Sequence, residues 1–168
     1  IEPGKRLFVE GASTGTGYDC LRSAVSSGLS VAGMVSSAER AERVEAVGGA
    51  AVDRKDPKWA AAFTPVPDDP SQWAAWEDAG VDFVEAAKTA AGGDLNYAVS
   101  HAGETAFPRT FQTLGDGGVL TFYGASSGYR FTFMGKKGES SPAEMFTRAG
   151  LRAGQSLLIV YGPGADDG

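Results

Sequence analysis

The feature that most constrains this chain is the stretch of residues 5–18, where an apolar run breaks into a glycine-rich loop and then enters a helical pattern. Residues 7–9 show no polar alternation, which is typical of a strand covered on both faces of a parallel sheet. The helix after the loop is expected to end near Ser27. A strand, a glycine loop and a helix in this order can bind an anion, because the helix start offers N–H groups and a partial positive charge.

The glycines of the loop are Gly11, Gly15 and Gly17. They fit the spacing G-x-x-x-G-x-G, which several reductase families use. The dinucleotide pattern G-x-G-x-x-G fits less well, because its three positions fall on Ala12, Thr14 and Gly17. A Walker phosphate loop is excluded, since no Gly-Lys-Ser or Gly-Lys-Thr follows. An ordinary tight turn is the alternative interpretation of the loop taken alone.

The end of the second expected strand, residues 29–35, adds weight to the nucleotide interpretation. Ser36 and Ser37 follow this strand, and Arg40 and Arg43 lie on the next expected helix, residues 38–47. A site selective for NAD usually places an acid here, whereas small polar and basic residues suit the 2′-phosphate of NADP. The alternative is a serine helix cap followed by two solvated arginines.

Strands and helices alternate along the rest of the chain. Residues 54–80 are expected to form an ordered insertion, because they contain three Trp side chains that need cover. Alternation demands parallel pairing with right-handed crossovers. The sequence therefore predicts an α/β fold with a doubly wound parallel sheet, a three-layer αβα Rossmann domain with strand order 3-2-1-4-5-6. The further expected strands are residues 48–53, 95–100, 119–123 and 157–161, the further helices 81–91, 107–114 and 142–149, and a turn covers 115–118.

Composition limits the domain count and the classes of partner. With 168 residues, of which 42% are hydrophobic, the chain can bury one domain core but not two ordinary ones. A net charge of −6 argues against a nucleic-acid surface. No apolar run approaches the ~20 residues of a membrane span, and no signal peptide opens the chain, so a cytoplasmic protein without a membrane partner is expected. The chain enters its first strand without an initiator Met, which predicts a module cut from a longer chain.

Six short motifs together resemble those of a known family. They are GASTGTG at 11–17, MVSS at 34–37, VDRKD at 52–56, WEDAG at 76–80, SHAGETAF at 100–107 and GASSGY at 124–129. With them the chain resembles the cofactor-binding half of a medium-chain dehydrogenase/reductase of the enoyl-CoA reductase branch. It is most similar to crotonyl-CoA carboxylase/reductase and to the acrylyl-CoA reductase part of propionyl-CoA synthase.

The resemblance implies that NADPH delivers hydride to the β-carbon of a short α,β-unsaturated acyl-CoA. It also implies that the other half of the polypeptide is a partner of this one, and that the full-length protein can form a homo-oligomer. No metal is implied. The implied cofactor contacts are Ser13, Thr14, Gly15, Thr16 and Gly17 around the pyrophosphate, Ser36, Ser37, Arg40 and Arg43 around the 2′-phosphate, and Gly124, Ala125 and Ser126 near the nicotinamide.

His101 is the catalytic candidate, because it matches a histidine that helps to hold CO2 in the carboxylating members of the family. The alternative is a polar residue that caps the end of the fourth strand. Ser100 and Ala102 replace the acidic residue and the proline that flank this histidine in the carboxylases. This departure favours simple reduction over reductive carboxylation.

Two rival functions stay open at this point. One is a non-catalytic Rossmann-like module that serves in interdomain contact or regulation, and the imperfect glycine spacing motivates it. The other is a short-chain reductase, which also uses G-x-x-x-G-x-G. No Tyr-x-x-x-Lys pair occurs in the sequence, and this absence disfavours the short-chain class.

Overall fold

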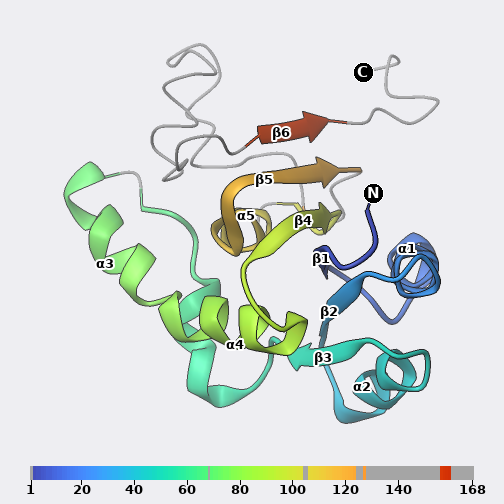
Figure 1. Ribbon diagram of the computed structural model, residues 1–168. Coiled ribbons are helices and arrows are strands. Elements are labelled where there is room, and N and C mark those ends of the chain that lie inside the picture. The colour runs from blue at the N-terminus through green and yellow to red at the C-terminus, as the bar shows by residue number, and fades with distance from the viewer. Residues whose placement is uncertain (1, 68, 104–105, 124–126, 128–155, 160–168) are drawn as a thin grey trace, which may run out of the picture.

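The chain folds around one six-stranded sheet in the order β3-β2-β1-β4-β5-β6, in which every pairing is parallel (Figure 1). The computed structural model describes residues 2–67, 69–103, 106–123, 127 and 156–159. The observed order confirms the doubly wound sheet that the alternating pattern predicted. The strands are β1 (Arg6–Val9), β2 (Ser30–Val35), β3 (Ala50–Asp53), β4 (Leu95–Ser100), β5 (Leu114–Phe122) and β6 (Ser156–Ile159).

The helices lie in the connections between the strands, as the alternation requires. The expected helix at residues 142–149 lies outside the described residues, as do the loop residues 124–126. The helices are α1 (Gly15–Ser26), α2 (Ala38–Glu45), the 3₁₀ segments η1 (Pro57–Phe63) and η2 (Pro70–Gln72), α3 (Trp73–Asp78), α4 (Val81–Ala91) and α5 (Phe107–Gln112).

The region before the fifth strand differs from the prediction. The helix α5 ends at Gln112, and residues 115–118 do not form a separate turn but belong to β5. The pairing register with β4 shifts there, from Leu95 opposite Leu114 to Tyr97 opposite Val119. A run of glycines permits this bulge, because Gly117 has a φ of 75°, in the left-handed region.

Helices cover both faces of the sheet and give three layers. Successive residues of β1 point to opposite faces, so Phe8 belongs to one buried cluster while Leu7 and Val9 belong to the other. The first cluster includes Phe83 of α4 and Phe107 of α5, and the second includes residues of α1 and α2. The amino end of α1 is thereby held at the carboxyl edge of β1.

The described residues between β3 and α4 pack against the first cluster, to which they contribute Trp59, Ala62, Val66 and Trp76. The indole N–H of Trp59 donates to the carbonyl of Asp53 at 2.7 Å, and that of Trp76 donates to the carbonyl of Thr64 at 2.9 Å. Both indoles are buried. Trp59 and Trp76 therefore each bury their ring and satisfy its one polar atom.

Arg109 of α5 fastens this segment to the sheet. Its side chain is 1% exposed, and its guanidinium donates to the carbonyls of Ala62 at 2.7 Å and Trp76 at 3.0 Å while it lies 3.8 Å from the centre of the Trp76 ring. Burial lowers the pKa of Arg109 to about 10, although nearby Glu77 opposes this shift. Carbonyl groups from two parts of the segment thus share one cation.

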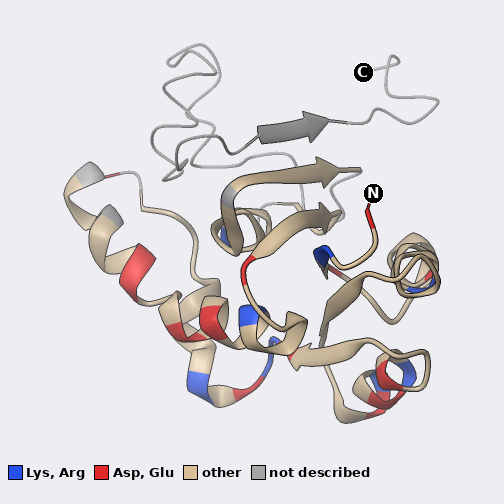
Figure 2. Ribbon diagram, in the orientation of Figure 1, with Lys and Arg blue, Asp and Glu red and all other residues tan. Residues whose placement is uncertain are grey.

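Most charged side chains of the described residues lie on helices and connections, and the strands carry few (Figure 2). In α2 both signs alternate, with Glu39, Arg40, Glu42, Arg43 and Glu45 along eight residues. Within the described part of the chain, no helix has both the length and the apolar character needed to cross a bilayer.

Candidate functional site

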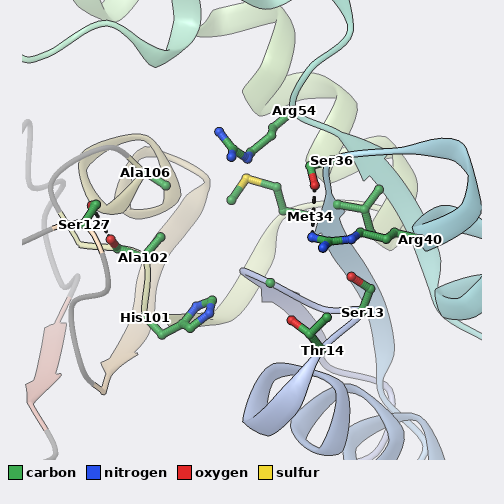
Figure 3. A pocket seen from close by; sticks show the side chains of 12 residues that line it. Ser13, Thr14, Met34, Ser36, Arg40, Arg54, His101, Ala102, Ala106 and Ser127 are labelled. Carbon is green, nitrogen blue, oxygen red and sulfur yellow. Dashed lines mark hydrogen bonds between the residues drawn. The ribbon is translucent and has the colours of Figure 1, made fainter.

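A cavity of about 320 Å³ opens at the carboxyl edge of the sheet, where the strand order reverses between β1 and β4 (Figure 3). Ligands of doubly wound sheets bind at this point, because loops from both halves of the sheet meet there. The lining residues are Gly11, Ser13, Thr14, Met34, Val35, Ser36, Arg40, Arg54, His101, Ala102, Ala106 and Ser127.

The glycines of the loop have three different roles. Gly11 and Gly15 have φ values of 57° and 51°, which side chains rarely adopt, and a Cβ built on Gly15 meets only open space. A Cβ built on Gly17 would lie 2.5 Å from the carbonyl oxygen of Gly11 and 2.8 Å from that of Glu10. Gly17 therefore lets α1 approach β1 closely and aims the helix start at the cavity.

The amino end of α1 is open toward a ligand. Thr14 is the N-cap residue and makes no side-chain cap hydrogen bond. The first N–H groups of a helix have no partner inside the helix. Ser13 and Thr14 line the cavity, whereas Thr16 lines a separate apolar cavity of about 500 Å³ between α1 and the sheet. Of the predicted pyrophosphate contacts, Ser13 and Thr14 line this cavity, whereas Gly15, Thr16 and Gly17 are not among its lining residues.

The two serines after β2 differ in what they do. The guanidinium Nη1 of Arg40 donates to Ser36 Oγ at 3.1 Å, and both residues line the cavity. Ser37 is the N-cap of α2, and its Oγ accepts a hydrogen bond from the backbone N–H of Arg40 at 3.4 Å. The helix-cap alternative thus describes Ser37, while Ser36 and Arg40 take part in the site.

The two predicted arginines do not lie together in the cavity. Arg43 is not among the residues that line it, and its guanidinium carbon lies 4.2 Å from the centre of the Tyr18 ring on α1. Arg54, which the sequence analysis assigned to the insertion, lines the cavity instead. The backbone N–H of Arg54 donates to the carbonyl of Val35 at 3.0 Å, and this hydrogen bond extends the pairing of β2 with β3. Its position directly after the predicted third strand was the available signal.

His101 reaches the cavity from the end of β4, as Figure 3 shows. Its ring stacks on Tyr123 with centroids 5.5 Å apart and planes inclined by 25°. Burial raises the pKa of Tyr123 to about 12, with smaller contributions from Cys20 and Glu10. The predicted nicotinamide contacts Gly124, Ala125 and Ser126 lie outside the described residues. Next to them, the Ser127 N–H donates to the carbonyl of Ala102 at 2.9 Å.

Glu10 is a site residue that the sequence analysis missed. It follows β1 directly, is fully buried, and accepts hydrogen bonds from the backbone N–H groups of His101 and Ala102, two residues that line the cavity. One of its carboxylate oxygens lies 3.9 Å from His101 Nδ1. The available signal was an acidic residue between an apolar strand and a glycine, a place where a side chain is expected to be buried. A carboxylate buried there needs several hydrogen-bond donors around it.

The sequence matches no protein-family model and no curated protein. Solved structures do match. Crotonyl-CoA carboxylase/reductase AntE in complex with NADP has 19% identity and a TM-score of 0.75, over 96% of this chain and 37% of that one. The 2-octenoyl-CoA carboxylase reductase CinF, in complex with NADP and 2-octenoyl-CoA, has 19% identity and a TM-score of 0.70, over 96% and 33%.

A 2-haloacrylate reductase is also similar, with 18% identity and a TM-score of 0.66 over 95% of this chain and 40% of that one. All three belong to the medium-chain dehydrogenase/reductase superfamily. This chain spans 33% to 40% of the length of these solved chains. It therefore has the fold of one segment of the carboxylase/reductases and reductases that its sequence motifs resemble.

Proposed function

We propose that this chain is the NADPH-binding part of a reductase in the enoyl-CoA branch of the medium-chain dehydrogenase/reductases. The observation that carries the proposal is the cavity at the sheet's switch point, with a helix start on one wall and two guanidinium groups, Arg40 and Arg54, among its lining residues. The solved structures of similar fold that hold NADP support it.

The residues of the cavity fit a phosphorylated dinucleotide. The N–H groups of the first turn of α1 and the hydroxyls of Ser13 and Thr14 suit a pyrophosphate. Ser36, Arg40 and Arg54 suit the 2′-phosphate, because guanidinium groups donate paired hydrogen bonds to phosphate oxygens. Among the described residues that line the cavity there is no carboxylate to favour the free ribose hydroxyl of NADH.

The chemistry of the bound cofactor is hydride delivery from the reduced nicotinamide. The part of this chain is to bind the dinucleotide, fix its orientation and shield it from water. Gly124, Ala125 and Ser126 stay the predicted contacts of the nicotinamide end. The proposed substrate is a short α,β-unsaturated acyl-CoA, held together with the remainder of a longer polypeptide, and simple reduction is proposed in place of carboxylation.

Calorimetric titration of the chain with NADPH and NADH tests the proposal. We expect NADPH to bind more tightly. Arg40→Gln and Arg54→Gln should each weaken NADPH on the order of tenfold to a hundredfold, the effect of losing a charge-assisted hydrogen bond of about 1.5–3 kcal/mol. Both variants should leave NADH nearly unchanged.

Arg43→Gln is the matched control, because it removes the same charge from the same helix but outside the cavity. NADPH affinity should survive this change. Equal affinity for NADPH and NADH, or an equal loss in all three variants, would contradict the assignment of the 2′-phosphate site. No measurable binding of either nucleotide would favour the rival, a non-catalytic Rossmann-like module.

A further inference from the structure

Glu10 connects the end of β1 to three elements of the fold through its carboxylate. Oε1 accepts from the hydroxyl of Ser100 at 2.8 Å and from that of Thr110, and Oε2 accepts from the N–H groups of His101 at 3.0 Å and Ala102 at 2.9 Å. The side chain is fully buried. The backbone N–H groups can only donate, so Oε2 is fixed as an acceptor beside the imidazole of His101.

The imidazole of His101 is confined on three sides. A Cβ on Gly11 would lie 2.7 Å from Nε2 and in collision with Cε1, so the ring packs directly against the Gly11 backbone in this position. Tyr123 stacks on one face, and Glu10 Oε2 lies 3.9 Å from Nδ1. Nδ1 is buried and makes no hydrogen bond within the described part of the chain. The side chain is still 30% exposed, and His101 is one of the residues that line the cavity.

A neutral imidazole carries its proton on one nitrogen, and the neighbours of the ring decide which one. A lone pair on Nδ1 would face a carboxylate oxygen, whereas an N–H there faces it with the favourable sign. We propose that Glu10 is a positioning residue that holds the proton of His101 on Nδ1. Nε2 then presents its lone pair to the cavity and accepts a hydrogen bond from an N–H or O–H group of a bound ligand.

The identity of that ligand group rests on the proposed function. At the nicotinamide end of the dinucleotide, neutral donors of this kind are the carboxamide N–H and the hydroxyls of the ribose beside the nicotinamide. The tautomer itself does not depend on the cofactor, because Glu10 sets it within the protein. A failure of nucleotide binding and a failure of this inference are therefore separate results.

Nitrogen NMR of protein labelled with ¹⁵N-histidine tests the tautomer, because His101 is the single histidine of the chain. In the neutral ring of the ligand-free protein we expect Nδ1 in the protonated range and Nε2 in the unprotonated range. Glu10→Gln should lower the population of this tautomer. The control Glu39→Gln removes an equal charge from an exposed position on α2 and should leave the spectrum unchanged.

A ligand-free protein whose proton resides on Nε2 would overturn the inference, and this measurement needs no variant to fold. A Glu10→Gln protein that folds and keeps the wild-type tautomer would remove the role of Glu10. Loss of the tautomer in both Glu10→Gln and Glu39→Gln would also count against it, because the effect would then be one of net charge.

Three probes identify the donor group once binding is established by calorimetry. NADP⁺ carries both donors, 2′-phospho-ADP-ribose keeps the second ribose but lacks the carboxamide, and 2′,5′-ADP lacks both. We expect the Nε2 resonance to shift with NADP⁺ and to stay in place with 2′,5′-ADP. A shift with 2′-phospho-ADP-ribose assigns the ribose hydroxyl. A bound NADP⁺ that leaves Nε2 unmoved would overturn the acceptor role.

Discussion

At the scale of single residues, substitutions at two glycines of one loop distinguish the cost of backbone strain from the cost of steric crowding. Gly15→Ala forces a side chain into a positive φ but meets open space, so we expect a loss of about 1–2 kcal/mol in the free energy of unfolding. Gly17→Ala places a Cβ against two backbone carbonyl oxygens that cannot move aside, so we expect about 3 kcal/mol or more. Urea unfolding followed by Trp fluorescence measures both. Equal losses would show that crowding at α1 does not set its position.

Tyr123 gives a prediction about pH at the same scale. Its pKa is raised from 10.0 to about 12, so the folded state keeps a proton that the unfolded chain releases. The stability due to the neutral phenol is therefore complete below pH 10 and is lost as the pH rises toward 12. Absorbance of the phenolate should show one late transition near pH 12 that Tyr123→Phe removes. A difference spectrum that titrates near pH 10 would contradict the burial of this phenol.

The sequence predicted part of the site at residue level. Ser13, Thr14, Ser36 and Arg40 line the cavity. Their positions could be predicted because each follows the end of a strand closely, and runs of apolar residues reveal where the strands end. Arg43 lies apart from the cavity, with its guanidinium over the ring of Tyr18. Which of two arginines about one turn apart faces the cavity depends on how α2 is rotated about its axis, and the sequence does not reveal that rotation.

At the scale of elements, Arg109 joins α5 to the insertion, and we expect its loss to loosen that segment first. Arg109→Met keeps much of the buried volume but leaves at least two buried carbonyls without their donor, which costs about 1–3 kcal/mol for each group. Hydrogen exchange should rise in residues 54–80 before it rises in the strands. Arg22→Met, at an exposed position of α1, is the control. Uniform loss of protection across the sheet would contradict a local role.

Prediction of the elements succeeded where the hydrophobic pattern is regular and failed where glycines replace it. The alternation of strands and helices predicted a parallel sheet, and the strand order followed from the fit of six strands to the doubly wound dinucleotide-binding sheet. Residues 115–118 were expected to be a turn, since glycine-rich runs usually end an element. They instead pair with β4 across a bulge. This pairing depends on contacts with a neighbouring strand, and the local composition of residues 115–118 does not reveal such contacts.

At the scale of the whole molecule, the two halves of the sheet contribute different parts of the site. The half with β1, β2 and β3 supplies the helix start and the guanidinium groups, and β4 supplies His101 at its carboxyl end. Glu10 crosses this boundary, because it ends β1 and binds the backbone that follows β4. The buried carboxylate thus couples the region proposed for the phosphates to the region proposed for the nicotinamide.

The contact between Gly11 and His101 has an evolutionary consequence. The imidazole fills the volume that a side chain at position 11 would need, so a larger residue there requires the ring to shift, in addition to the cost of a φ of 57°. Among relatives with this arrangement, a residue other than glycine at the first position should coincide with a smaller residue at the second. Pairwise covariation between these two columns of an alignment would record that steric exclusion.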